Sequence, residues 1–175
     1  MPEFSLEELI SATAGKPVRN GNQEKIYGVS IDSRTLVPGE VFFALKGPNF
    51  DGHDYVEAAI NKGAAAVIIE KEIALPPAWP GLVIKVPDSR HALGHLARYH
   101  RLRFELPVIG ITGSNGKTTT KELCAAILTQ RGNVVKTEKN FNNEIGLPLT
   151  LFKISTATKA VVVEMGMRGK GQIAY

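Results

Sequence analysis

The sequence has few of the features that mark extracellular or membrane-bound proteins. It contains one cysteine in 175 residues, Cys124, so no disulfide can form within the chain. It has no run of about twenty apolar residues, the length that a membrane-spanning helix needs. The first nine residues include three glutamates, whereas a secretory signal peptide has a basic and then an apolar stretch. These absences predict a cytoplasmic protein without a membrane span.

The charge pattern gives no sign of nucleic-acid binding. The formal net charge is +4, and many of the basic residues lie in residues 85–103, together with three histidines. This segment contains no nucleic-acid recognition motif, so we interpret it as the solvated face of a helix. No cysteine joins the histidines, and no structural zinc site is expected. An apolar content of 43% is sufficient for a sizeable core.

Two α/β segments are predicted along the chain. Residues 1–86 combine a helix opened by a Ser5/Glu8 capping box with strands and a second helix, and so form a small α/β domain. A helix capped by Asp88 or Ser89 fills most of a linker, residues 87–106. Residues 107–175 form the second domain. In residues 1–86 the expected elements are strands at 26–33, 41–45, 64–70 and 82–86, and a helix at 53–62.

The second segment has the alternation typical of a parallel sheet. Strands are predicted at 108–112, 133–137 and 160–164, with helices at 117–130 and 145–153 between them. Helices that alternate with apolar strands favour parallel pairing with right-handed crossovers. The predicted fold class is therefore α/β, a small N-terminal domain followed by part of a parallel-sheet domain.

Residues 108–120 read Val-Ile-Gly-Ile-Thr-Gly-Ser-Asn-Gly-Lys-Thr-Thr-Thr and are the most informative stretch. An apolar strand passes into a glycine-rich turn that opens onto a helix. The backbone N–H groups of such a turn and the positive end of the helix dipole bind phosphate. We expect a lysine near the β- and γ-phosphates of ATP and a threonine hydroxyl on Mg²⁺. The candidate ATP-binding residues are Gly113, Ser114, Asn115, Gly116, Lys117, Thr118 and Thr119.

One position departs from the generic phosphate-loop pattern. That pattern has a glycine five residues before Gly116, where this chain has Ile111. An alternative is a strand-to-helix turn without a ligand. This alternative requires two glycines, a lysine and two threonines to coincide at the right offsets, so we favour the phosphate loop.

Polar residues also follow the other predicted strands of this segment. Glu164 ends the apolar run of residues 160–163, at the edge where open parallel sheets bind ligands. We predict that it holds Mg²⁺ together with Thr118, and that Lys117 and Glu164 are catalytic. The alternative is a strand-end glutamate that faces water. Three asparagines, Asn140, Asn142 and Asn143, are candidates for orienting a polar substrate.

The sequence resembles the Mur ligases of bacterial peptidoglycan synthesis. In the second segment the resemblance rests on residues 112–122 (Thr-Gly-Ser-Asn-Gly-Lys-Thr-Thr-Thr-Lys-Glu), residues 140–150 (Asn-Phe-Asn-Asn-Glu-Ile-Gly-Leu-Pro-Leu-Thr) and residues 164–167 (Glu-Met-Gly-Met). In the first segment it rests on residues 30–34, 38–39, 46–47 and 50–53. The family's phosphate loop also lacks the first glycine.

The resemblance implies a UDP-binding first domain and an ATP-dependent amide ligase. The substrates would be UDP-N-acetylmuramoyl-tripeptide and D-Ala-D-Ala, joined through an acyl phosphate, with ATP and Mg²⁺. Hydroxyl and guanidinium groups suit a diphosphate, with Asp32 orienting Arg34. Without the resemblance, Asp32 and Arg34 could simply stabilise a turn. The candidate UDP-binding residues are Ser30, Asp32, Ser33, Arg34, Lys46 and His53.

Family members extend well beyond residue 175. We therefore expect a fragment that binds nucleotides but forms no amide bond alone, and that is a monomer. Three alternatives remain open: another ligase of the family such as MurE, a P-loop phosphotransferase or NTPase, and a non-catalytic UDP-sugar binding module.

Overall fold

The computed structural model describes residues 1–139 and 141–166, and the chain divides into two compact units after Leu96. The division falls within helix α3 (Ser89–Leu102), whereas the sequence analysis placed a boundary on each side of this helix. The limits 1–86, 87–106 and 107–175 stay a prediction. Asn140, one of the candidate substrate-orienting residues, lies outside the described residues.

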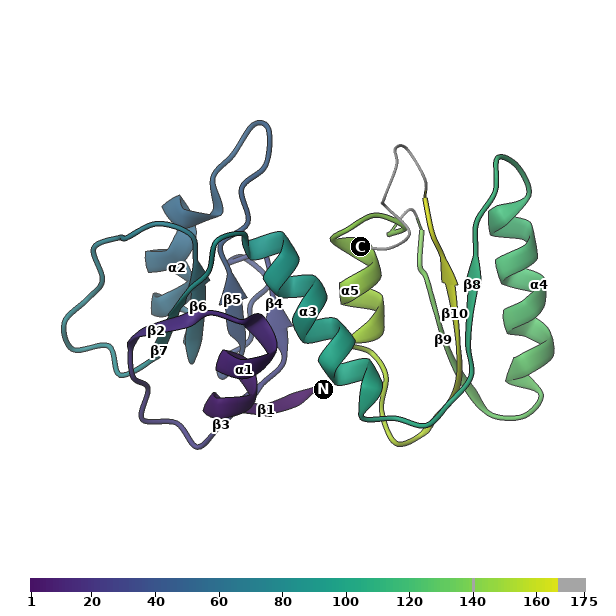
Figure 1. The fold of residues 1–175 in the computed structure, drawn as a ribbon, viewed down its shortest axis with the longest axis horizontal. Coiled ribbons are helices and arrows are strands. Elements are labelled where there is room, and N and C mark those ends of the chain that lie inside the picture. The colour runs from purple at the N-terminus through teal and green to yellow at the C-terminus, as the bar shows by residue number, and fades with distance from the viewer. Residues whose placement is uncertain (140, 167–175) are drawn as a thin grey trace. The chain divides into compact units, whose positions relative to one another are not determined.

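The first unit is built on a five-stranded sheet (Figure 1). Neighbouring strands pair in parallel from β4 through β7, and the edge strand β2 is antiparallel to β7. The order across the sheet is β2 (Lys16–Arg19), β7 (Leu82–Lys85), β6 (Ala66–Ile69), β5 (Val41–Phe43) and β4 (Val29–Ser30).

Besides the first part of α3, this unit contains three further helical segments and a small second sheet. Helix α1 (Leu6–Thr13) begins with the predicted capping box, in which Glu8 N–H donates to Ser5 Oγ and Ser5 N–H donates to the Glu8 carboxylate. A 3₁₀ turn, η1 (Gly52–Tyr55), leads into α2 (Val56–Asn61), where the sequence predicted one helix. The second sheet pairs β1 (Glu3–Ser5) with β3 (Lys25–Tyr27).

One apolar cluster of the first unit lies between the parallel strands and α2. Strand β6 is buried along its whole length, as expected for a central parallel strand. Phe42, Val67 and Val83 pack with Val56 and Ala59 of α2 in one apolar cluster.

The strand predicted over residues 26–33 is two strands. Gly28 separates β3 from β4 with a φ of 87°, a left-handed conformation that glycine adopts readily. A Cβ atom at this position would lie 2.7 Å from Oε1 of Glu40. The glycine therefore lets the chain leave one sheet and enter the other.

The second unit contains a three-stranded sheet in which every pairing is parallel. Its order is β8 (Val108–Ile111), β10 (Thr158–Glu164) and β9 (Asn133–Lys136), so the last strand in sequence is central. Figure 1 shows α4 (Lys117–Thr129) and α5 (Gly146–Leu151) on opposite faces of this sheet. The predicted α/β class and parallel sheet are confirmed.

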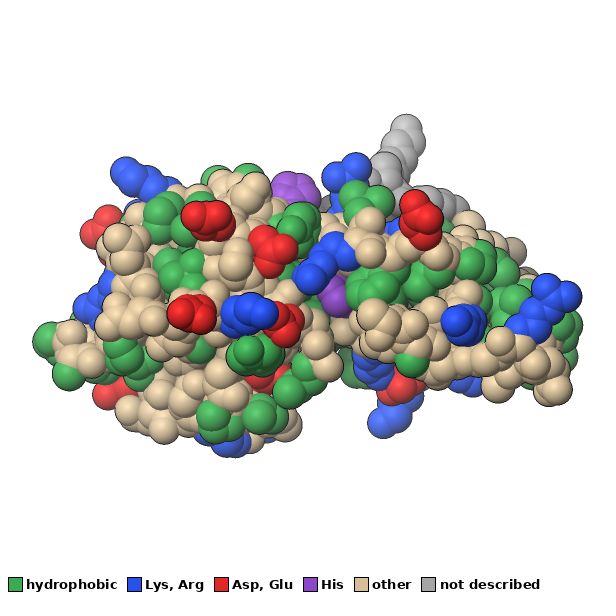
Figure 2. Space-filling model, turned by 90° about the horizontal axis from the view of Figure 1, so that it is seen from below, with side chains coloured by type: hydrophobic (Ala, Val, Ile, Leu, Met, Phe, Trp, Pro, Cys, Tyr) green, Lys and Arg blue, Asp and Glu red, His purple; other side chains and the backbone are tan. Residues whose placement is uncertain are grey.

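The outer face of the second unit carries exposed apolar side chains. Leu123 and Ile127 of α4 are 62% and 71% exposed. Figure 2 shows hydrophobic side chains, in green, at the end of this unit on which Figure 1 draws α4. Within the described part of the chain, each helix is too short or too polar to cross a bilayer.

Candidate functional site

The turn between β8 and α4 has the backbone conformation of a phosphate loop. Gly113 and Gly116 have φ values of 145° and 78°, and Gly116 is the residue that precedes the helix. A Cβ at Gly116 would meet nothing within 4 Å, so glycine is needed here for its backbone conformation and not for space. Residues 112–116 are exposed, which leaves their amides accessible to a ligand at the helix N-terminus.

Lys117 folds back over its own loop. Its ammonium group donates to the carbonyl oxygen of Gly113 at 2.6 Å and lies 3.4 Å from that of Ser114. This position holds a positive charge directly above the glycine-rich turn. A phosphate bound to the loop would therefore meet both the amides and this ammonium group.

Thr118 and Glu164 meet at the carboxyl edge of the sheet. The Thr118 hydroxyl donates to Oε2 of Glu164 at 2.9 Å, although the residues are 46 positions apart. Glu164 is buried, and its Oε1 accepts a hydrogen bond of 2.9 Å from the Asn142 side chain. Its backbone N–H donates to the buried Thr137 hydroxyl. Three other chain segments thus hold Glu164 in place.

A lysine that the sequence analysis did not single out lies beside this carboxylate. Lys121 is 2% exposed, and its Nζ is 3.9 Å from Oε2 of Glu164 and 3.2 Å from Oε1 of Glu122. On the outer side, Lys136 also contacts Glu122. Hydrogen bonds from Lys136 and then Lys121 hold the pKa of the Glu122 carboxyl below its ordinary value. The result is an alternating row of two lysines and two glutamates that ends at Thr118.

The donor set at this edge fits a magnesium ion. Mg²⁺ prefers oxygen ligands and is held in proteins through one or two carboxylates, with substrate phosphates and water completing the coordination. Thr118 and Glu164 supply a hydroxyl and a carboxylate oxygen. Among the described residues there is no group of three or more His, Cys, Asp or Glu side chains that could hold a metal. A cation here would need oxygen atoms from a ligand.

The two described asparagines of the predicted set differ in what they do. Asn142 points at Glu164, as given above. Asn143 accepts hydrogen bonds from the backbone N–H groups of Ile145 and Gly146, at 3.2 and 2.8 Å, and so caps the start of α5. Its side-chain oxygen is therefore engaged by the fold, and its substrate-orienting role stays a prediction.

In the first unit, the predicted UDP-binding residues follow strands whose carboxyl ends share one edge of the sheet. Asp32 accepts from Arg34 Nε at 2.9 Å and from Nη2 at 2.7 Å. These bonds from Arg34 lower the pKa of the Asp32 carboxyl to about 2. The Arg34 side chain is 87% exposed, and among the described residues its Nη1 has no hydrogen-bond partner. Ser30 and Ser33 are buried, and Lys46 is exposed.

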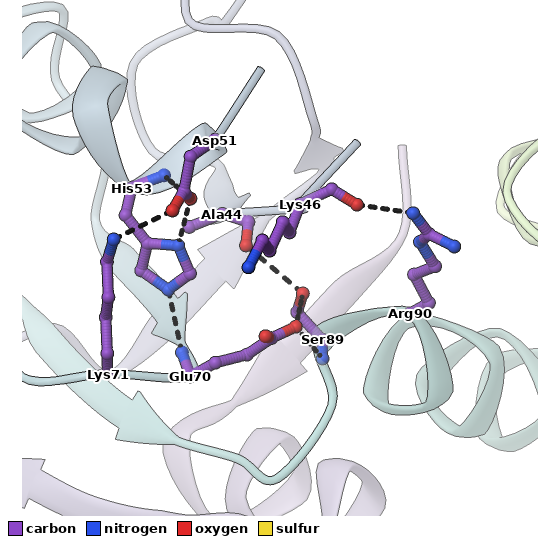
Figure 3. A network of polar contacts seen from close by, with 8 residues as sticks. All are labelled: Ala44, Lys46, Asp51, His53, Glu70, Lys71, Ser89 and Arg90. Atoms are coloured by element: carbon purple, nitrogen blue, oxygen red, sulfur yellow. Dashed lines mark hydrogen bonds and ion pairs between the residues drawn. The ribbon is translucent and has the colours of Figure 1, made fainter. Parts of the chain in front are cut away.

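His53 is locked into the fold through both ring nitrogens (Figure 3). The Glu70 backbone N–H donates to Nε2 at 2.9 Å, so the ring proton resides on Nδ1 and is donated to Asp51 at 2.5 Å. The side chain is 2% exposed. With both nitrogens engaged, His53 can support a ligand site by positioning the loop but offers it no ring atom.

The same network ties this loop to the start of α3. Figure 3 shows Glu70 and Ser89 facing one another beside Ala44. Glu70 Oε1 accepts from the Ser89 backbone N–H at 2.8 Å and from its hydroxyl at 2.6 Å. Asp88 is the residue that caps the helix, because its Oδ1 accepts from the N–H groups of Arg90 and His91.

Asp51 carries the negative charge of this network. A hydrogen bond from Lys71, together with those from the His53 backbone and ring, holds the pKa of the Asp51 carboxyl well below its ordinary value. The Lys71 contact is 2.7 Å long. Residues 46 and 51 also pair as an isolated β-bridge, so the loop between them is closed on itself.

Sequence reasoning missed Lys121, Asp51 and Glu70. For Lys121 a signal was present: it follows Thr118 by three positions and Lys117 by four, which places all three on one side of a helix. Asp51 and Glu70 follow strands or loops and have no such periodic signal. Each has a side-chain partner 19 or 20 positions away in sequence.

Fold and site together define the class of protein. The second unit has the strand, glycine-rich turn and helix of a P-loop nucleotide-binding domain, and it follows a separate α/β unit. The chain belongs to the Mur ligase family. Residues 25–101 match the model of the Mur ligase family catalytic domain, and residues 111–175 match that of the Mur ligase middle domain.

Individual relatives agree with this family. The chain is 47% identical over 153 residues to the UDP-N-acetylmuramoyl-tripeptide--D-alanyl-D-alanine ligase of Synechocystis, covering 86% of this chain and 33% of that protein. A crystal structure of MurF from Acinetobacter baumannii superposes with a TM-score of 0.90 at 33% identity, over 99% of this chain and 38% of the other. The structure of MurF from Thermotoga maritima in complex with ADP superposes with a TM-score of 0.76 at 37% identity, over 84% of this chain and 34% of the other. The chain spans about a third of the length of the curated relatives that it matches.

Proposed function

We propose that these 175 residues supply the UDP-substrate unit and part of the ATP site of an ATP-dependent amide ligase. The ligase would add D-Ala-D-Ala to UDP-N-acetylmuramoyl-tripeptide in peptidoglycan synthesis. Curated relatives that carry this name include proteins 35–47% identical to the chain. The contact between Thr118 and Glu164 is the observation that carries the proposal, because it joins the phosphate loop to an acidic strand end.

The proposed reaction activates a carboxylate as an acyl phosphate. The tripeptide carboxylate attacks the γ-phosphorus of ATP, ADP leaves, and the amine of D-Ala-D-Ala then displaces phosphate. Two anions must approach each other in the first step, so fixed positive charge is needed. The loop amides and Lys117 bind and orient the phosphates, and Glu164 and Thr118 would hold Mg²⁺. When bound, Mg²⁺ supplies additional charge neutralisation at the phosphates.

The first unit would bind the UDP part of the substrate. Arg34 is exposed, with its fork oriented by Asp32 and Nη1 left for a diphosphate oxygen. Ser30 and Ser33 would donate hydroxyl hydrogen bonds to the same diphosphate. Lys46, which follows the neighbouring strand β5, would add a positive charge. In this proposal His53 acts indirectly, because it fixes the loop after Lys46.

Calorimetry on the chain tests both halves separately. ATP should bind more tightly with Mg²⁺ than without, whereas UDP-N-acetylmuramoyl-tripeptide should bind equally well with and without the metal. Arg34→Ala should weaken the UDP ligand and leave ATP unchanged, and Lys117→Ala should do the reverse. A chain that binds neither ligand, or that binds ATP with no effect of Mg²⁺, would contradict the proposal.

A phosphotransferase or NTPase is the second candidate, because the phosphate loop alone would serve it equally well. This alternative gives no role to the first unit. Binding of the UDP ligand would show that the protein is more than a phosphotransferase or NTPase. Another ligase of the family, such as MurE, would prefer a UDP-linked dipeptide over the tripeptide. We also propose that the protein is cytoplasmic, since its proposed substrates, ATP and a UDP-linked precursor, are intracellular, and that it acts as a monomer.

A further inference from the structure

Lys121 is buried where a charged side chain is costly. An ammonium group that loses its hydration must be compensated by nearby negative charge or hydrogen bonds. Lys121 has Glu122 at 3.2 Å and Glu164 at 3.9 Å. It is the one buried lysine or arginine among the described residues. The other buried residue of α4, Ala125, lies one turn later and is uncharged. A side chain that only packs against the sheet from this helix therefore needs no charge.

The position of Lys121 sets the charge of the candidate site. Glu164 presents Oε2 to the Thr118 hydroxyl, and Lys121 lies on the same oxygen. Three cationic side chains (Lys117, Lys121 and Lys136) and two carboxylates (Glu122 and Glu164) surround this edge. The edge is therefore positive before any ligand binds. Such a site attracts phosphate and repels an isolated divalent cation.

We propose that Lys121 is a positioning residue that makes cation binding depend on nucleotide binding. With Lys121 in place, the Glu164 carboxylate already has a cation 3.9 Å away, so Mg²⁺ binds weakly alone. Phosphate oxygens then supply the negative charge and the missing ligands, and the cation binds together with ATP. This inference rests on the proposed nucleotide site and adds a role that the phosphate loop itself does not require.

Metal binding to the chain tests this directly. Mn²⁺, a paramagnetic substitute for Mg²⁺, is titrated by electron paramagnetic resonance with and without a non-hydrolysable ATP analogue, with correction for Mn²⁺ bound by free analogue. In the unaltered protein the analogue should tighten Mn²⁺ binding strongly. In Lys121→Met, Mn²⁺ alone should bind on the order of tenfold more tightly, because a positive charge next to Glu164 is gone. The tightening by the analogue should shrink, because in the complex the phosphates supply most of the negative charge that binds Mn²⁺ and the lost lysine matters less. The effect of Mn²⁺ on the affinity for the analogue should shrink by the same factor, since coupling between two ligands is reciprocal.

Two control variants separate charge from structure. Lys136→Met removes the same charge from the row but contacts Glu122 and not Glu164, so its Mn²⁺ affinity should change much less. Lys121→Arg keeps the charge and should behave like the unaltered protein. If Lys121→Met loses its cooperative melting in circular dichroism, Lys121→Gln replaces it.

The outcomes are distinct. A merely structural lysine would give weaker binding of both Mn²⁺ and the analogue in Lys121→Met, and this result would overturn the inference. Unchanged Mn²⁺ affinity in Lys121→Met would overturn it as well. Failure of the unaltered protein to bind the analogue with Mn²⁺ would instead count against the proposed function.

Discussion

The polar networks of the two units differ in how completely they are closed. In the first unit, His53, Glu70 and Ser89 satisfy one another over distances of 2.6–2.9 Å beneath the surface. In the second unit, Thr118 and Glu164 meet beside an exposed glycine-rich loop, and the described partners of Lys117 are carbonyl oxygens of that loop. A closed network stabilises a fold, whereas an open one can exchange its internal contacts for a ligand. Substitutions in the closed network around His53 should therefore change stability, and those in the open network around Glu164 should change binding.

The largest effect is expected for Lys117→Ala. Loss of a charge-assisted contact to phosphate removes about 3 kcal/mol, so affinity for ATP with Mg²⁺ should fall about a hundredfold. Stability should stay nearly unchanged, because the contacts of the ammonium group with described residues are to exposed loop carbonyls. Isothermal titration calorimetry gives the affinity, and Lys159→Ala, an exposed lysine of the same unit, is the control. ATP affinity within threefold of the unaltered protein would contradict this prediction.

His53→Ala should produce the largest loss of stability. It leaves the Glu70 N–H and the Asp51 carboxylate without their partner and opens a cavity, at a cost of about 2–4 kcal/mol in unfolding free energy. Urea denaturation can be followed by the fluorescence of Trp79, the single tryptophan, which packs against the core of the first unit.

The matched control for this variant is His95→Ala, an exposed histidine in α3 of the same unit. Its unfolding free energy should change by less than about 0.5 kcal/mol. Equal losses in the two variants would show that the His53 network is not closed in the way described. Binding of ATP with Mg²⁺ should be preserved in both.

Glu164→Gln should reduce the effect of Mg²⁺ on ATP binding about tenfold, and change ATP binding without metal much less. The amide keeps an oxygen for the Thr118 hydroxyl but lacks the charge that attracts a cation. Calorimetry with and without Mg²⁺ measures the difference. Glu138→Gln, which removes an exposed carboxylate paired with Lys153, is the control and should leave the Mg²⁺ effect intact.

Asp51→Asn should lower the stability of the first unit by about 1–2 kcal/mol at pH 7. The pKa of Asp51 is lower in the folded protein than its ordinary value of about 3.9, so its contribution is complete above that value. The contribution is lost as the pH falls through the folded pKa. Urea denaturation at pH 7 and at pH 3 should therefore show a smaller difference between variant and unaltered protein at the lower pH. A difference that is constant or larger at pH 3 would count against the assigned charge.

The sequence predicts the second unit better than the first. Its elements alternate strictly, and strands β8, β9 and β10 were expected within one residue or two of their observed bounds. In the first unit, β2 was missed because its four residues include Pro17 and are largely exposed. An edge strand of this kind is defined by its pairing with β7 and not by its own apolar pattern. The break at Gly28 was also missed. The alternation of apolar and polar residues continues across Gly28, whereas the pairing partner changes from β1 for β3 to β5 for β4.

The candidate site was predictable only in part. Glycine spacing and the strand-end Glu164 are local signals, and they indicated Thr118 and Glu164 as partners before any geometry was known. The burial of Lys121 depends on two carboxylates from different elements, which no local pattern reports. The closure of His53 likewise depends on a backbone N–H at position 70.

The order of the second sheet has a consequence for synthesis. Strand β10 lies between β8 and β9, and these two pair with it but not with each other. During synthesis the glycine-rich turn leaves the ribosome before Glu164. The three-stranded sheet and the contact between Thr118 and Glu164 therefore cannot form until residues 158–164 have emerged. A chain truncated before Thr158 should thus contain β8 and β9 without their pairing partner, and such unpaired strands are prone to aggregation.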